Sequence, residues 1–284
     1  MVQPALQRPG EEAGRYCVPE VLVLQAYQHH ALVRIGQPSN VPESQTRRRT
    51  GSAAALPDSS SNPAAATEAA DRALQKSKAV ASRTYRWLDG LPNNFERLSM
   101  SGMQLGMHDA VVLADFLSRR GRQLVELDLK CNQLNRAALD LIFGALKECP
   151  KLSGLALAEN PLQLGGGGGQ GGQKGALGSW IGDALVTCVP RLEKLGLGST
   201  GLSDDDVCEL GARLKNSNYL KVLGLSTNPI SLAGVEGLLN GIKRGRGQAP
   251  ASLHTLVLSN CSGLHQGDAA SLRALAVPGL SIKF

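Results

Sequence analysis

Hydrophobic residues recur along much of this chain in one fixed order. Each copy begins with a hydrophobic residue, usually leucine. A leucine stands three positions later, another hydrophobic residue stands two positions after that leucine, and a turn follows. The order starts at residues 95, 124, 152, 192, 220 and 253. Its two central hydrophobic residues are two positions apart, so they point to one side of a strand while their neighbours point to the other. The pattern predicts six short strands, each buried on one side.

A second hydrophobic pattern follows four of these strands. It consists of two apolar residues spaced four apart, which lie on one face of a helix. The pairs are Leu113 and Leu117, Ile142 and Leu146, Leu210 and Leu214, and Leu238 and Ile242. The chain is therefore expected to alternate strand and helix, with each helix pressed on the back of the strands.

Between strand and helix, each unit has a position that asparagine occupies in the best copies. The residues at this position are Met103, Asn132, Asn160, Thr200, Asn228 and Cys261. A polar side chain here can bond backbone groups that the turn leaves unpaired. Met103 cannot do so, which suits a first unit modified for capping.

The units repeat every 28 or 29 residues, apart from two longer gaps that contain extra residues. A unit of this size cannot bury its apolar face alone, but stacked units share a core. In these motifs the chain resembles the leucine-rich repeat family, and its period with full helices is similar to the ribonuclease-inhibitor-like subclass. The resemblance covers roughly residues 95 to 277. It implies an α/β fold, a right-handed solenoid of about six to seven repeats with a parallel sheet inside the curve and helices outside, and a protein-binding role.

The chain outside the repeats divides into segments of different composition. Residues 1–62 are expected to be a mostly disordered tail that contains a short apolar segment at 18–35, for which docking on the same chain stays open. Residues 63–94 are expected to form a helical cap on the repeat domain, 95–284, which has insertions at 165–175 and 243–250. The cap residues expected to close the first repeat are Ala70, Leu74, Val80, Tyr85 and Trp87.

Composition agrees with a leucine-filled repeat protein. The 284 residues are 42% hydrophobic but only 4% aromatic. The six cysteines form no CxxC pair, which favours reduced thiols and a cytoplasmic or nuclear protein. No apolar run is long enough for a membrane span, and no signal peptide is recognised. The net charge of +6 permits acidic partners, but the basic residues are not interleaved with aromatics, so nucleic acid is not favoured as a partner.

No motif for catalysis, a cofactor or a metal is found. The glycine run at 165–172 has no defined glycine spacing, and Lys174 follows Gln173 and not a glycine, so the run is interpreted as a low-complexity insertion and not as a nucleotide-binding loop. Asp204, Asp205 and Asp206 follow Ser203 where a helix should begin, and are expected to stabilise its first turn. The basic cluster at 47–49, beside Thr50 and Ser52, leaves a phosphorylation site or an import signal open.

The outward positions of the strands form the candidate binding surface. Its residues are Arg97, Glu126, Asp128, Lys130, Ala156, Lys194, Gly196, Gly224, Ser226 and Val257. Charge in the first units gives way to small residues, over which an extended segment or a helix of a partner is expected to lie. The alternative is that glycine and alanine merely permit tight curvature, and that this surface binds nothing.

The function expected from sequence is that of a non-enzymatic, monomeric protein-binding module or adaptor. Two alternatives remain open. The resembled subclass includes activators of small GTPases, which implies a regulatory role. A structural part of a cytoskeletal or ciliary assembly would instead use the helices and the tail for docking.

Overall fold

The chain divides into two compact units, residues 1–70 and 71–284. The computed structural model describes residues 63–162, 175–215, 217–243, 252–265, 267–275 and 279–284. The expected tail, its apolar segment at 18–35 and most of both insertions lie outside the described residues. Only the start of one helix represents the first unit, and the sheet with its other helices belongs to the second.

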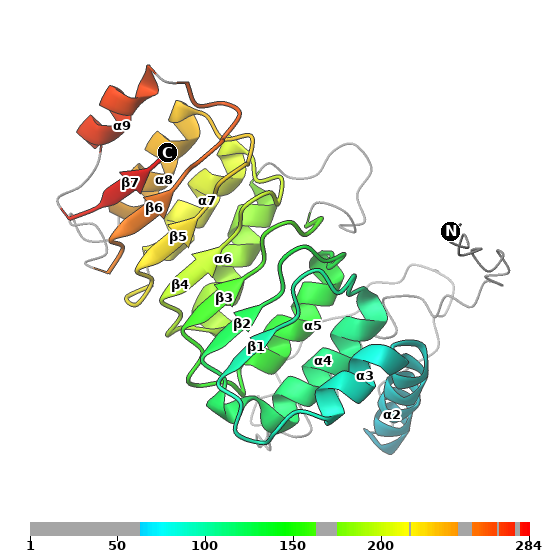
Figure 1. Cartoon of the computed structure of the whole chain (residues 1–284). Helices are drawn as coiled ribbons and strands as arrows, with labels where there is room; N and C mark the ends of the chain where they lie inside the picture. Colours follow the sequence, from blue (N-terminus) through cyan, green and yellow to red (C-terminus); the bar gives the residue numbers. More distant parts are fainter. Residues whose placement is uncertain (1–62, 163–174, 216, 244–251, 266, 276–278) are drawn as a thin grey trace, which may run out of the picture. The chain divides into compact units, whose positions relative to one another are not determined.

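A parallel sheet runs through the second unit (Figure 1). In the described residues it has seven strands in chain order, namely β1 (Arg97–Ser99), β2 (Glu126–Asp128), β3 (Gly154–Ala156), β4 (Lys194–Gly196), β5 (Val222–Gly224), β6 (Thr255–Val257) and β7 (Ser281–Lys283). Neighbouring strands pair without a register shift, so Leu127, Leu155 and Leu195 lie side by side in one row. The six expected strands are confirmed, and the hydrophobic pattern sets their register.

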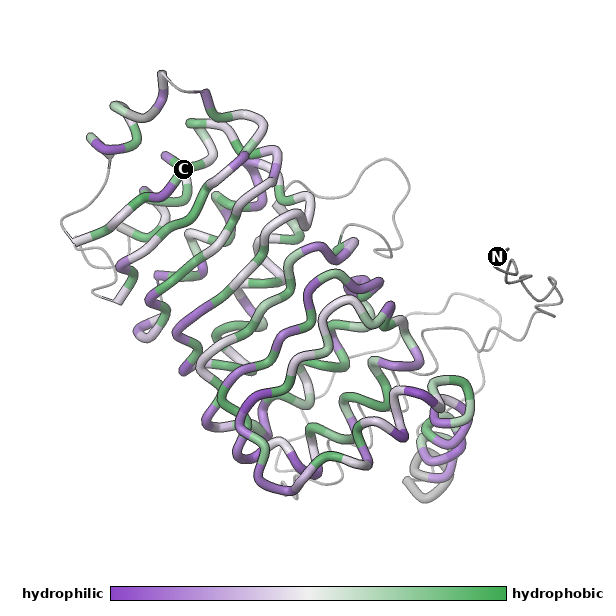
Figure 2. The backbone as a smooth tube through the Cα atoms, in the orientation of Figure 1, coloured by the Kyte–Doolittle hydropathy of each residue, from purple (hydrophilic) through white to green (hydrophobic). Residues whose placement is uncertain are grey.

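From α4 onwards, helices alternate with the strands and cover one face of the sheet (Figure 1). The described helices are α2 (Pro63–Val80) and α3 (Ser82–Asp89), which both precede β1, and then α4 (Met107–Arg120), the short 3-10 helix η1 (Gly121–Gln123), α5 (Arg136–Leu146), α6 (Ala176–Cys188), α7 (Asp204–Leu214), α8 (Leu232–Lys243) and α9 (Asp268–Leu275). All eight apolar residues predicted to face the strands are at most 3% exposed. Figure 2 shows hydrophobic stretches recurring in both layers, as a shared core requires.

The seventh strand was not predicted. Ile282 of β7 pairs with Leu256, and Leu280 before it is buried. The alternation of Leu280, Ile282 and Phe284 was the available signal, but the strand lies too close to the end of the sequence for the full repeat pattern to be present. The sheet thus extends one strand beyond the range of the resemblance.

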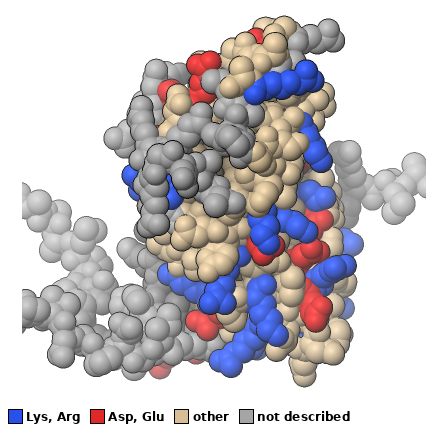
Figure 3. Space-filling model, turned by 90° about the vertical axis from the view of Figure 1, so that its left-hand side faces the viewer, with Lys and Arg blue, Asp and Glu red and all other residues tan. Residues whose placement is uncertain are grey.

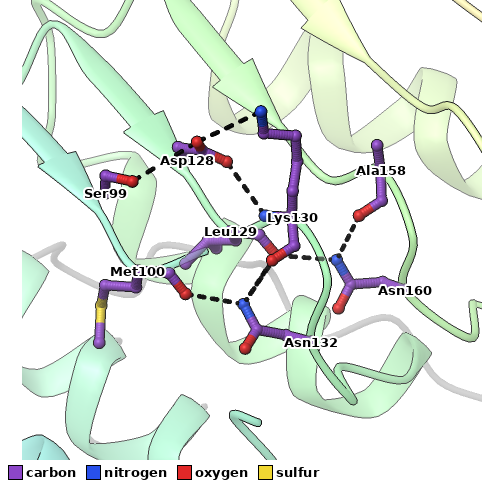
Figure 4. Close-up of polar contacts among 8 residues, drawn as sticks. All are labelled: Ser99, Met100, Asp128, Leu129, Lys130, Asn132, Ala158 and Asn160. Atoms are coloured by element: carbon purple, nitrogen blue, oxygen red, sulfur yellow. Dashed lines mark hydrogen bonds and ion pairs between the residues drawn. The ribbon is translucent and has the colours of Figure 1, made fainter. Parts of the chain in front are cut away.

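Buried asparagines join three of the units to the unit before them, and Figure 4 shows two of these asparagines, Asn132 and Asn160. Asn132 donates from Nδ2 to the carbonyl oxygens of Met100 and Leu129, each at 2.9 Å, and accepts at Oδ1 from the Leu105 amide. Asn160 bonds the next pair of units in the same way, through Leu129 and Leu134. These bonds satisfy backbone groups that the turn removes from the ladder. Met103 needs no such bond to an earlier strand, since β1 is first in the sheet.

Two units replace asparagine with a side chain that makes fewer bonds. Thr200 donates to the carbonyl oxygen of Leu197 in its own unit at 2.8 Å, and the Cys261 thiol lies 3.5 Å from the carbonyl oxygen of Leu225. Asn228 compensates on one side, because its Oδ1 accepts from three consecutive amides, those of Thr200, Gly201 and Leu202. Thr200 and Cys261, which make fewer bonds, therefore stand in the units on either side of Asn228, the asparagine with the most bonds.

The residue before the asparagine position has a left-handed backbone in every unit. These residues are Gly102, Cys131, Glu159, Ser199, Thr227 and Asn260, with φ between 52° and 68°. Side chains other than glycine and asparagine rarely adopt this conformation. The strand ladder imposes it, because the Cys131 amide donates to the carbonyl oxygen of Ala158 and the Thr227 amide to that of Ser259.

Glycines allow helices α6, α7 and α8 to approach closely. A Cβ at Gly178 of α6 would lie 1.7 Å from the backbone oxygen of Asp206, and one at Gly211 of α7 would lie 2.5 Å from that of Leu238. Both distances are far below van der Waals contact, so these positions require glycine. Helix α7 begins as predicted, with Ser203 and Asp206 forming a capping box.

Part of the expected cap is wrong. Val80 is 61% exposed and Trp87 is 39% exposed, so neither closes the first repeat. Ala70, another of the expected cap residues, is buried, and the other buried residues of α2 and α3 and between them are Ser77, Ala81, Thr84 and Leu88. Thr84 donates to Asp109 of α4 at 2.5 Å and Ser77 lies 3.2 Å from His108. Because Ser77 and Thr84 are polar, a search for apolar residues missed them.

Replacing Asn228 with alanine tests the role of the buried asparagines. Asn228→Ala removes the side-chain acceptor of three amides, and it removes one donor from the carbonyl oxygens of Leu197 and Leu225 in the core. The free energy of unfolding, measured by urea denaturation, is expected to fall by about 3 kcal/mol. Asn218→Ala, at an exposed loop position, is the control and should change it by less than about 0.5 kcal/mol. Equal effects in the two variants would contradict this role.

Candidate functional site

The face of the sheet that points away from the helices carries the outward strand positions, and is called the open face here. Its first row, from the first residue of each strand, is Arg97, Glu126, Gly154, Lys194, Val222, Thr255 and Ser281. Its second row, from the third residue, is Ser99, Asp128, Ala156, Gly196, Gly224, Val257 and Lys283. In the described part of the chain, no strand or helix covers these rows.

Charged side chains at the β1 end of the open face are joined in a network. Glu126 lies 3.3 Å from Arg97 and, through its other oxygen, 3.8 Å from Lys194. Strand β3 lies between Glu126 and Lys194, and its residue in this row is Gly154. A Cβ there would lie 3.2 Å from the Glu126 side chain. Glycine thus leaves room for an ion pair that spans three strands.

Asp128 makes a second polar group in the next row (Figure 4). Its carboxylate accepts from the Lys130 amide at 3.1 Å and lies 3.5 Å from both the Lys130 ammonium and the Ser99 hydroxyl. These groups remain partly exposed, so each ion pair adds little to stability. Their charges are available to a partner.

The middle of the second row is a floor of small residues, Ala156, Gly196 and Gly224. A Cβ at Gly196 would lie 3.7 Å from Ala156 Cα, and one at Gly224 would lie 3.8 Å from Gly196 Cα. Both are ordinary contact distances, so alanine would fit. Close packing therefore requires glycine at Gly178 and Gly211, but it does not require glycine in this floor.

All ten residues expected to bind a partner lie where the sequence placed them. Three are in the first row and five in the second, while Lys130 and Ser226 follow the ends of β2 and β5. Two open-face residues were missed, Ser281 and Lys283, because β7 was not predicted. Whether these residues bind a partner stays a prediction.

The chain matches no protein-family model and no curated protein. Among solved structures it is similar to an internalin (inlF) from Listeria monocytogenes, with 16% identity and a TM-score of 0.36, over 66% of this chain and 39% of that one. Internalin C2 from the same bacterium gives 19% identity and a TM-score of 0.35, over 74% and 81%. The chain spans about two fifths of the first internalin's length, and scores this low carry no argument.

The geometry of the chain itself shows which fold it has. Seven parallel strands follow one another in register, each leucine row is buried, and asparagines bond unit to unit. The chain has a leucine-rich repeat fold. Its strands alternate with full helices, as the resemblance to the ribonuclease-inhibitor-like subclass implied.

The described part of the leucine-rich repeat contains no group of three or more His, Cys, Asp or Glu side chains that could hold a metal ion. Burial raises the pKa of the Cys149 thiol to about 12, and a hydrogen bond with Glu159 raises the pKa of the exposed Cys131. Both thiols are protonated at neutral pH and are poor nucleophiles. None of the described helices has the length and apolar character needed to cross a membrane.

The helix layer has a hollow of about 480 Å³ between α5, α6 and α7. Three of its charged groups have partners within the leucine-rich repeat. Asp183 bonds Arg213 at 2.6 Å, and the Arg136 guanidinium lies 5.2 Å from the Trp180 ring centre. Trp180 in turn donates to Asp140, whose pKa is raised by burial. The hollow belongs to the helix layer and not to the open face.

Substituting alanine in the small floor decides whether the fold itself needs glycine there. The double variant Gly196→Ala with Gly224→Ala is expected to keep or slightly raise the free energy of unfolding, because strand glycines cost about 0.5–1 kcal/mol relative to alanine. Chemical denaturation measures this. Gly211→Ala, where the methyl group meets the backbone of α8, is the contrasting variant and should destabilise by about 2 kcal/mol or more. A comparable loss in the floor variant would show that curvature requires these glycines.

Proposed function

We propose that this leucine-rich repeat is a non-enzymatic protein-binding module, which holds an extended segment or a helix of a partner protein across the open face. The observation that carries the proposal is the floor of Ala156, Gly196 and Gly224, which packing does not require and which charged residues border on the β1 side. Small side chains let a partner's backbone approach the sheet closely.

The dimensions of the floor suit a short segment. From Asp128 on β2 to Val257 on β6 the row crosses four strand spacings, which is roughly 19 Å at the usual separation of neighbouring strands. An extended chain of about six residues covers that length. The Glu126 and Asp128 carboxylates, with Lys130 beside them, would then fix the polar end of the segment.

Three parts of the proposal are supported by the sequence alone. They are that the protein is not an enzyme, that it is cytoplasmic and that it is monomeric. Neither alternative function has a specific contact in its favour, and the structural-assembly alternative would place the partner on the helices.

Arginine in the floor is expected to block the partner. In Gly196→Arg with Gly224→Arg, two long charged side chains occupy the space of the bound segment, while the free room around both positions leaves the fold intact. Capture of the partner in a pull-down should be lost without a lower melting temperature. The matched control is Gly90→Arg with Gly144→Arg, which adds the same charge at exposed positions outside the open face. Unchanged capture by the floor variant would discard the proposal.

Cross-linking mass spectrometry on the same complex locates the partner. Lysine cross-links to the partner should concentrate on Lys130 and Lys194, which border the open face. Cross-links confined to helix-layer lysines, such as Lys76 of α2, would instead support docking through the helices.

A further inference from the structure

Basic residues gather where the strands begin. This side of the repeat domain, which lies to the left in Figure 1, faces the viewer in Figure 3, and Lys and Arg side chains are prominent over its lower part. Exposed basic residues in the loops that connect each helix to the next strand, and at the strand starts, are Arg97, Arg122, Lys147, Lys151, Arg191, Lys194, Lys215 and Lys221.

Three exposed side chains form a ridge at the centre of this side. Lys151, Arg191 and Tyr219 each stand directly before the first leucine of consecutive units. The ladder that starts two residues later holds these units side by side: the Glu193 amide donates to the Ser153 carbonyl oxygen at 2.8 Å, and the Lys221 amide to that of Glu193 at 2.7 Å. The three side chains therefore project from adjacent loops, and are called the basic ridge here.

The ridge has charge and aromatic surface that the fold does not use. Arg191 has no ion pair among the described residues, and the nearest polar partner of Lys151 is the neutral Gln123. Tyr219 is 48% exposed, although it is a large hydrophobic residue. Arginine and tyrosine are the side chains that most often dominate protein-protein binding energy when a partner covers them.

Helix dipoles do not account for these charges. Basic residues in a last helical turn offset the negative helix end, but α5 and α6, the helices that precede Lys151 and Arg191, have no basic residue in their last turn. Both ridge residues stand further on, next to the strand. At the opposite edge, the first turns of α4, α7 and α9 carry acidic residues, for example Asp109 and Asp204, whereas α5 begins with Arg136.

We propose that the basic ridge is a second docking surface, which binds an acidic segment of a protein partner. The carboxylates of that acidic segment would pair with Lys151 and Arg191, and an apolar or aromatic residue of the segment would pack on Tyr219. Nucleic acid fits less well, because Glu193 and Glu126 lie among the basic residues and would repel phosphates. The ridge is a different surface from the open face, so its binding does not depend on the function proposed above.

Binding of a fluorescein-labelled poly-glutamate peptide to the full chain, followed by fluorescence anisotropy, tests the ridge. The double reversal Lys151→Glu with Arg191→Glu should weaken binding by about tenfold or more, since like charges then face the peptide. The control Lys76→Glu with Arg83→Glu makes the same change in net charge at exposed sites on α2 and α3, and should weaken binding far less. Equal losses in the two variants would overturn the proposal.

Further variants and a second probe distinguish the possible outcomes. If the double reversal lowers the melting temperature, Lys151→Gln with Arg191→Gln replaces it. Binding of a labelled peptide of alternating glutamate and tyrosine should also weaken in Tyr219→Ala, which changes no charge, and an unchanged affinity would contradict the role of Tyr219. A poly-dT oligonucleotide that binds more tightly than the peptides, and loses binding in the ridge variant, would overturn the proposal in favour of a nucleic-acid surface.

Discussion

The structure depends on buried asparagine amides that bond backbone groups of two units at once. Each strand is only three residues long, so the strand ladder alone provides few hydrogen bonds between neighbouring units. Asn132, Asn160 and Asn228 continue that ladder through the turn, where the chain leaves the sheet towards the helix. Without them, several backbone groups per unit would lie buried and unpaired, at about 1–3 kcal/mol each.

This constraint leaves the open face free. Leucines and asparagines both point into the space between sheet and helices, so the first and third residues of each strand have no part in the core. Helices α6 to α8 pack through glycines that a Cβ would exclude, whereas the floor glycines Gly196 and Gly224 have room for a side chain. Glycine therefore serves two purposes in one fold: helix contact on one side of the sheet, and space on the other.

The sequence was sufficient for the repeat architecture, the register of the first six strands and the placement of the ten candidate residues at these strands, because each depends on a period of leucine that the fold must keep. Other features depend on contacts that no period reveals. The cap buries Ser77 and Thr84 through bonds to α4, the left-handed Thr227 is imposed by the ladder, and Gly154 makes room for the Lys194 to Glu126 pair. The basic ridge was missed because its residues come from separate loops and form no cluster in the sequence.

Hydrogen exchange of individual amides, measured by NMR, tests the central role of the asparagines most directly. The amides of Leu105, Leu134 and Leu202 lie outside the strands and donate to asparagine side-chain oxygens. If the asparagines join the units, these three amides exchange as slowly as the strand amides of Leu127 and Leu223, because the same cooperative opening exposes both. Exchange at the rate of exposed loop amides would show that the asparagine bonds do not hold the units together.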